Sequence, residues 1–222
     1  MKYAAWIICI FLLPITAFAG LTSAPRKSQF EKALNVIIAS TTPDLFTDAR
    51  ESLIDRYVDG KLNKALAVQP VYRQYFRSEH HEDETMAGDR TLEACQLRFA
   101  KLCALIAVNE DIVAEGQLIY RDMPRLLYSG QFDLSQIPII TLATRTRFDV
   151  QNYWAAPEPK AIAIHPWGTL FIATGSGTSN EAQETVLTKC NNDFIRSNKD
   201  GPCFLYAINN DVVLSQRRTR AK

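Results

Sequence analysis

The stretch CALIAVNEDIV at residues 103–113 returns as CFLYAINNDVV at residues 203–213. Upstream, KALAVQP at residues 64–70 is matched by KAIAIHP at residues 160–166. The matched segments follow one another in the same order in both halves of the chain. The sequence therefore predicts an internal repeat and, with it, two like structural units in tandem.

The alignment of the two copies has three blocks. Matched residues are offset by 96 up to Pro70, by 95 at Cys95 and by 100 from Cys103 onward. The last change places a five-residue insertion in the second copy near residues 196–201, within a Ser-Asn-Lys-Asp-Gly stretch. Such a composition is typical of a surface loop, which tolerates insertions.

The same series of elements is expected in each copy. In the second copy we expect strands at residues 160–165, 169–174, 204–208 and 211–214, and in the first copy an opening pair at 64–69 and 72–77. A helix lies between the second and third strands, and in the second copy its apolar residues recur at helical spacing to Phe194. Thr178 and Glu181 fit a capping box at its start. The predicted fold class is α+β, with two tandem β-β-α-β-β units, each a small antiparallel sheet plus a helix.

The cysteines fit this division. Of the five, Cys9 lies in the apolar N-terminal stretch, which leaves four for the folded protein. An even set in an exported protein predicts disulfides, and four cysteines allow three connectivities. The repeat selects the one that keeps each pair within a copy, Cys95–Cys103 and Cys190–Cys203.

The N-terminus has the features of a secretory signal peptide over residues 1–19. Lys2 precedes an apolar stretch from residue 4 to residue 13, and Ala17-Phe18-Ala19 fits a cleavage site before Gly20. The apolar run is shorter than the ~20 residues that a spanning helix needs. We therefore expect a periplasmic or secreted protein, cleaved near Ala19-Gly20; the alternative is an uncleaved anchor.

Charge and composition limit the possible partners. Removal of residues 1–19 takes away one lysine and no acid, which leaves 24 basic and 24 acidic residues. A neutral chain argues against nucleic-acid binding, which needs a basic surface. The basic residues of the tail at 216–222 favour a frayed, solvated end, with a peripheral contact to anionic lipid as the alternative.

Helical lead-ins are expected before each unit. The apolar residues of the first are Phe46, Ala49, Leu53, Ile54 and Tyr57, and those of the second are Leu142, Phe148, Val150 and Tyr153. A further helix places Phe30, Ala33, Leu34, Ile37 and Ile38 on one face. The predicted division is a signal peptide at 1–19, an N-terminal helix at 20–42, repeat unit 1 at 43–117, a linker at 118–137, repeat unit 2 at 138–215 and the basic tail at 216–222. We expect the linker to pack against the units, with a short helix around Met123–Tyr128.

One cluster suggests a metal site. His80, His81 and Glu82, followed by Asp83, offer imidazole and carboxylate ligands suited to zinc or another divalent metal. Side chains of adjacent residues point apart, however, and no other part of the sequence completes the ligand set. The alternative is a solvated acidic loop before a helix. No cofactor is predicted.

Candidate binding residues lie in the second copy. Gly175 and Gly177 precede a helix, whose first backbone amides can hold an anion, but their spacing is neither a P-loop nor a dinucleotide fingerprint. A turn plus an N-cap explains them equally. His165 and Trp167 follow a strand, and His165 with a cysteine suggests a nucleophile pair. Disulfide formation opposes that pair, and the alternative is a histidine at the edge of the core.

The pattern KAxAxHPxG…C…PCxLYAxxxxVV resembles an uncharacterised domain of exported proteins of Gram-negative bacteria, often found at a chain's C-terminus. The resemblance is best over residues 153–213 and weaker over residues 57–113. The first copy lacks the His-Pro pair, the proline before its second cysteine and the tyrosine, which is Ile106 here. The resemblance implies export and paired cysteines, and it supplies no catalytic residues.

Together these features favour a non-enzymatic binding or protein-interaction module. Its expected partner is another envelope protein or a small ligand, not nucleic acid, and the oligomeric state is left open. If the copies pack as a pseudo-two-fold pair, a groove separates their sheets. The alternative is an envelope hydrolase or a metal-dependent enzyme with its site in the loops that the copies do not share. No catalytic residue is assigned.

Overall fold

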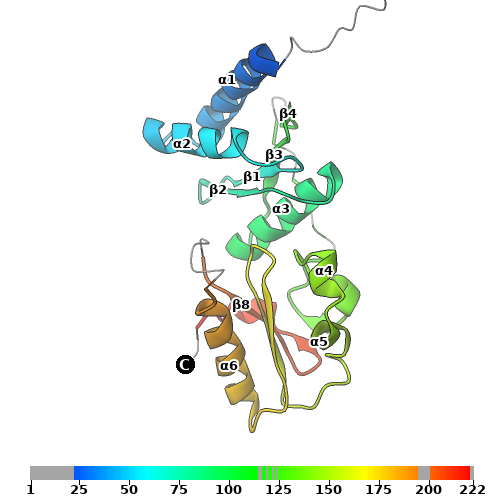
Figure 1. Ribbon diagram of the computed structural model, residues 1–222. Coiled ribbons are helices and arrows are strands. Elements are labelled where there is room, and N and C mark those ends of the chain that lie inside the picture. Colours follow the sequence, from blue (N-terminus) through cyan, green and yellow to red (C-terminus); the bar gives the residue numbers. More distant parts are fainter. Residues whose placement is uncertain are drawn as a thin grey trace, which may run out of the picture.

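The computed structural model describes residues 23–114, 117–118, 120–121, 123, 125–194 and 201–220. Two units follow one another along the chain, with the first two helices beyond the first unit (Figure 1). The predicted signal peptide at 1–19 and most of the insertion near 196–201 lie outside the described residues.

The first unit is a four-stranded antiparallel sheet with a helix on one face. Its strands are β1 (Ala65–Gln69), β2 (Gln74–Ser78), β3 (Ala104–Val108) and β4 (Asp111–Ile112), in the order β2-β1-β3-β4. Helix α3 (Glu84–Phe99) packs on the sheet and is capped by Asp83, whose side chain accepts a hydrogen bond from the Met86 amide. β2 begins two residues later than predicted, because Arg73 closes a turn onto the Pro70 carbonyl and has a φ of +53°.

The second unit repeats this plan and adds an edge strand. Its strands are β5 (Gly130–Gln131), β6 (Ala161–Ile164), β7 (Leu170–Ala173), β8 (Phe204–Ile208) and β9 (Asp211–Val212), in the order β5-β9-β8-β6-β7. Helix α6 (Ser179–Asn191) starts with the predicted capping box of Thr178 and Glu181. It ends before Phe194, which is exposed, and β9 is shorter than predicted because a 3-10 turn begins at Leu214.

The two sheets have the same strand register, which confirms the predicted α+β class. Ala65 faces both Ser78 and Val108, and Ala161 faces both Ala173 and Ile208. Each first strand has an irregularity at the same place, at Leu66/Ala67 and at Ile162/Ala163. Ser78 follows Ala65 by 13 residues and Ala173 follows Ala161 by 12, so the offset changes from 96 to 95 in the first hairpin turn.

Both disulfides are confirmed. Cys95 is bonded to Cys103 and Cys190 to Cys203, so each bridge ties a helix to the start of the following strand. Two such bridges are consistent with an oxidising, extracytoplasmic compartment. Within the described part of the chain, no helix is both long and apolar enough to cross a bilayer.

The N-terminal helices cover the other face of the first sheet. α1 (Ser23–Thr41) and α2 (Thr47–Val58) bury an apolar face against β1 and β3. Its buried members are Phe30, Leu34, Ile38, Ile54 and Tyr57. Three predicted members do not belong to it, since Ala33 and Ala49 are exposed and Phe46, at the start of α2, is 84% exposed.

The second lead-in is not the single helix that the apolar pattern predicts. It consists of two one-turn helices, α4 (Leu142–Arg145) and α5 (Phe148–Gln151). The helical conformation is interrupted at Arg147, whose backbone has φ −58° and ψ 139°. The Arg147 guanidinium donates to the Asp149 carboxylate and to the Leu170 carbonyl. Leu142 and Phe148 are exposed, whereas Val150 and Tyr153 are buried as expected.

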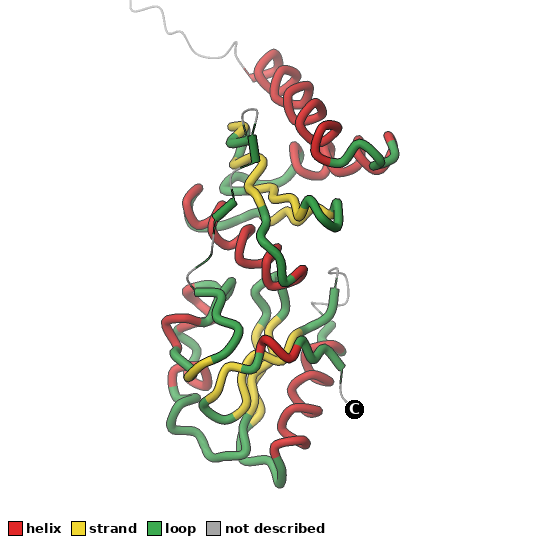
Figure 2. Tube along the Cα trace, turned by 180° about the vertical axis from the view of Figure 1, so that it is seen from behind, coloured by secondary structure: helices red, strands yellow, loops and turns green. Residues whose placement is uncertain are grey.

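The segment between the units packs as expected. Met123, Leu126, Phe132 and Ile137 are buried in one core with residues of α3 and of the second sheet. That core is continuous between the units, which lie against each other in both views (Figures 1 and 2). The predicted short helix is wrong for the described residues of 123–128, which have only turn and irregular structure.

The basic tail is docked and not frayed, at least to Thr219. Arg217 donates to the carbonyls of Leu97 and Arg98, both at 2.6 Å, and so caps the end of α3 in the other unit. Its guanidinium also lies over the Phe204 ring, 4.3 Å from the ring centroid. The expectation of a solvated end misses these contacts because they join residues about 120 positions apart.

A buried lysine repeats at the junction of helix and strand. In the first unit the Lys64 ammonium donates to the carbonyls of Val58 (2.6 Å) and Gly60 (2.9 Å) and lies over the Tyr57 ring. The Lys64 amide donates to the Asn109 side chain at 3.1 Å.

The second unit repeats these contacts. Lys160 donates to the carbonyls of Trp154 (2.7 Å) and Ala156 (3.0 Å), lies over Tyr153 and binds Asn209 through its amide. The Lys-Ala motif that opens each copy is thus a structural element of the fold.

Candidate functional site

A cavity of about 150 Å³ lies between the two units. From the first unit it is lined by the end of β2, by the loop that holds His80, His81 and Glu82, and by Arg90 of α3. From the second unit it is lined by residues 139 and 141 and by the Pro166-Trp167 turn. The structure thus brings two separately predicted candidate groups to one place. This space, the Arg90 cavity, lies between a loop, a helix and a turn, and not between the two sheets.

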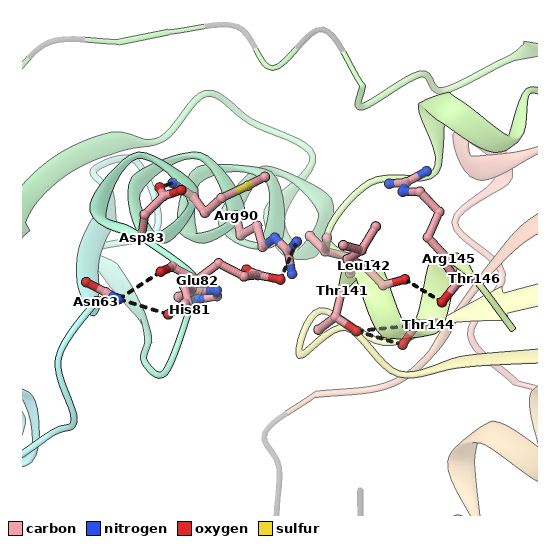
Figure 3. Close-up of polar contacts among 12 residues, drawn as sticks. Asn63, His81, Glu82, Asp83, Arg90, Thr141, Leu142, Thr144, Arg145 and Thr146 are labelled. Carbon is pink, nitrogen blue, oxygen red and sulfur yellow. Dashed lines mark hydrogen bonds and ion pairs between the residues drawn. The ribbon is translucent and has the colours of Figure 1, made fainter.

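Arg90 is the most unusual residue of the cavity. Its side chain is only 6% exposed, and its ion pair with Glu82 is long, with 3.4 Å between Nη2 and Oε1. Its Nε is buried and has no hydrogen-bond partner among the described residues. The guanidinium projects from α3 toward Thr141 and Leu142 (Figure 3). Among the described residues, this buried donor of a cationic side chain is therefore without an acceptor.

Arg90 belongs to a group of charged side chains that includes two further arginines and a buried carboxylate. Glu93 is buried and accepts hydrogen bonds from the Arg125 Nε at 2.7 Å and the Ile139 amide at 2.8 Å. Arg145 donates to the carbonyls of Leu134 and Ile137. Burial lowers the pKa of Arg145, and the nearby charges of Arg125 and Arg90 lower it further. Glu93 thus binds Arg125 and opposes the lowering of the Arg145 pKa, whereas the carboxylate paired with Arg90 is Glu82, and Glu79 also lines the cavity.

His81 contributes an uncharged polar group. Its Nε2 shares a hydrogen bond of 2.8 Å with the Ser78 hydroxyl, which in turn is bonded to Thr91. Burial lowers the pKa of His81 from its ordinary 6.5, and the charge of Arg90 lowers it further. The imidazole is therefore neutral at neutral pH.

The loop that carries His81 is held firmly. The Asn63 side chain donates to the carbonyls of His81 and Glu82, at 3.0 and 3.2 Å (Figure 3). The His81 amide donates back to the Asn63 carbonyl. These three hydrogen bonds fix the loop to Asn63.

The predicted metal ligands do not converge. The His81 ring is bonded to Ser78, Glu82 pairs with Arg90, and His80 is exposed on a backbone with a φ of +66°. Among the described residues, no group of three or more His, Cys, Asp and Glu side chains is placed to hold a metal ion.

His165 stands behind the cavity and shapes the turn that lines it. It is fully buried, its Nε2 lies 3.0 Å from the Gly201 carbonyl, and its Nδ1 accepts a hydrogen bond from the Trp167 amide at 3.2 Å. These partners require the proton on Nε2. Because Cys190 and Cys203 are bonded to each other, neither supplies a thiolate for His165.

Trp167 joins the two units. Its ring packs on that of Phe76 in β2, with centroids 5.4 Å apart and planes inclined at 43°. The sequence predicts Trp167 as a binding residue but gives no sign of this partner.

Gly175 and Gly177 do not belong to the cavity. They follow β7, at the end of that strand opposite to His165 and Trp167. A Cβ at Gly177 would lie 2.6 Å from the Glu181 carboxylate of the capping box, and Gly175 has a φ of +63°. Both glycines therefore have a local role in starting α6.

Sequence reasoning misses Arg90 itself. Arginines are usual on helices, and this one lies in a helix with no local motif. The available signal is a difference between the copies, because position 90 aligns with Thr185 at the offset of 95. No protein-family model, curated protein or solved structure matches the chain.

Proposed function

We propose that the protein is an exported, non-enzymatic binding module and that the Arg90 cavity takes a small anionic group such as a carboxylate. The buried Arg90 Nε without an acceptor carries this proposal. A buried donor left unpaired costs about 1–3 kcal/mol, and more when it is charged. A carboxylate removes that cost, since its two oxygens match the planar fork of a guanidinium.

The size of the cavity restricts the ligand. Its 150 Å³ equals the liquid volume of about five water molecules. Sites for whole drug-sized molecules measure about 300–1,000 Å³. The Arg90 cavity therefore holds a small anion, or only the anionic end of a larger ligand.

One charged and one neutral group determine which ligands the site selects. Glu82 is half exposed and holds Arg90 only by the long contact, so an anion can displace it toward solvent. The neutral His81 adds no charge and, with Ser78, offers hydrogen-bonding groups at the rim. The other carboxylate of the lining, Glu79, is held by Arg77 and by the Lys61 amide, so displacement of Glu82 leaves Arg90 for an anion with hydrogen-bonding oxygens.

Export and repetition belong to the same proposal. The apolar N-terminal stretch supports passage to the periplasm or beyond, where two disulfides persist. The matched registers, disulfides and buried lysines of the two units support an origin by duplication. Arg90 and the His80–Glu82 loop then belong to the first copy alone, which is where a copy-specific function is expected.

The proposal is tested by calorimetric titration of acetate into the purified protein. Ionic strength is kept equal in the protein and the acetate solutions. We expect saturable binding that Arg90→Met abolishes and Arg121→Met leaves unchanged, because Arg121 lies on the exposed surface. Equal binding by the Arg90 variant, or no saturation in the unaltered protein, would overturn the proposal.

A further inference from the structure

A second surface follows the outer edge of β2. In the order β2-β1-β3-β4, this strand has a neighbour on one side only. No described residue outside the sheet makes a hydrogen bond to the backbone of residues 74–77. An open edge of this kind is a template for another strand unless the protein blocks it.

The second unit shows how such an edge is blocked. There Arg147 donates to the outward-facing carbonyl of Leu170 in β7, at 3.0 Å. Leu170 pairs with Ile164, and its counterpart by register is Tyr75, which pairs with Val68. Because outward-facing groups alternate along a strand, Tyr75 and Arg77 present their backbone N–H and C=O groups outward. In the first unit no described side chain covers them.

A groove of about 400 Å³ runs along this edge. One wall is apolar and belongs to the first lead-in, with Leu45, Ala49 and Leu53. The opposite side holds Trp167 of the second unit beside Phe76. This β2 groove therefore offers apolar contacts on both sides of an exposed strand edge, as an added strand requires.

The charge of the β2 groove identifies the occupant. Its lining includes Arg56, Arg73, Arg77 and Arg98 and no acidic residue. Asp44 pairs with Arg73, and Glu79 lies 3.8 Å from Arg77, both from outside the lining. Two arginines of the groove thus have no acidic partner among the described residues. A second copy of this chain would bring two such arginine sets together, so like charges disfavour pairing of β2 with β2.

We infer that the β2 groove binds an extended acidic segment of a partner protein as an added strand. Backbone hydrogen bonds to Tyr75 and Arg77 supply the pairing, aliphatic side chains on one face of the segment contact an apolar wall, and acidic side chains on its other face lie toward the arginines. The inference does not depend on the Arg90 cavity, which is a separate space with its own lining.

The test uses a fluorescent peptide of alternating valine and glutamate, acetylated and amidated so that no terminal carboxylate can reach Arg90. Fluorescence anisotropy measures its affinity for the intact protein. We expect saturable binding, weakened about tenfold by Arg56→Gln with Arg98→Gln, since loss of ~1.4 kcal/mol has this effect. Arg121→Gln and Arg90→Met leave the affinity unchanged.

Two further probes separate strand addition from attraction by charge alone. A peptide methylated on alternate backbone nitrogens keeps its charge but loses the pairing edge, and we expect it to bind at least about tenfold more weakly. In the complex, the amides of Tyr75 and Arg77 become protected from hydrogen exchange. Equal affinity for the methylated peptide or for an oligothymidylate of equal charge, or unchanged exchange at both amides, would overturn the inference.

Discussion

Arg90 is buried and incompletely hydrogen-bonded, so we expect that its replacement does not destabilise the fold. Arg90→Met removes a buried charge and an Nε that has no partner among the described residues, and it loses the long contact to Glu82. Without an anion present, we expect the free energy of unfolding in urea to stay the same or rise by about 1 kcal/mol. A loss of more than ~2 kcal/mol would mean that Arg90 supports the fold and not a ligand.

His81 predicts a pH dependence with a definite sign. In the unfolded chain the imidazole takes up a proton near its ordinary pKa of 6.5, whereas burial and Arg90 lower the pKa in the folded protein. The unfolded state therefore binds more protons below pH 6.5. As the pH is lowered from 6.5 toward the pKa of the folded state, the free energy of unfolding decreases. Glu82 opposes this shift and His80 adds to it, but burial is the larger cause.

The measurement is the free energy of unfolding from about pH 8 to about pH 5, in the unaltered protein and in His81→Gln. We expect the difference between the two to be constant above pH 6.5 and to shift in favour of the variant below it. A pH-independent difference would show that His81 titrates alike in both states.

At the level of elements, the buried lysines join each helical lead-in to its first strand. Lys64→Met and Lys160→Met each leave two main-chain carbonyls without their donor. We expect each to lower the free energy of unfolding by about 1–3 kcal/mol. The exposed Lys61→Met serves as the matched control and is expected to have little effect. Near-additive losses in the double variant are expected, since the sites lie in separate units; no loss at either lysine would contradict this role.

Most elements could be predicted from the sequence because their signals are local. The short strands, the helical spacing of apolar residues and the capping box at Thr178 each require only neighbouring residues. The disulfides could be predicted because the repeat assigns one pair to each copy. The division of the second lead-in into two helices could not be predicted, because the interruption at Arg147 depends on the Leu170 carbonyl of a distant strand.

At the level of the whole molecule, Arg217 links the units by capping α3. We expect Arg217→Met to lower the free energy of unfolding by about 1.5–3 kcal/mol, because it removes two hydrogen bonds from a charged donor. Arg220→Met, at an exposed position nearby, is the control. Equal unfolding curves for the two variants would show that the tail does not stabilise the contact between units.

Neither the arrangement of the two units nor the Arg90 cavity could be predicted from the sequence. Its lining combines residues near 80, 90, 140 and 167, which no periodicity connects. The repeat pointed to the loops that the copies do not share, and the His80–Glu82 loop does line the cavity. It could not indicate Arg90, whose significance depends on burial and on a missing partner.

The proposal that Arg90 binds an anion is tested most directly by proton–nitrogen correlation spectra of the arginine Nε–H groups during an acetate titration. The signal that is absent from Arg90→Met should move downfield and reach saturation, while the Arg121 signal stays in place. If the Arg90 signal does not move, or if all arginine signals move together in proportion to salt, the cavity is not an anion site.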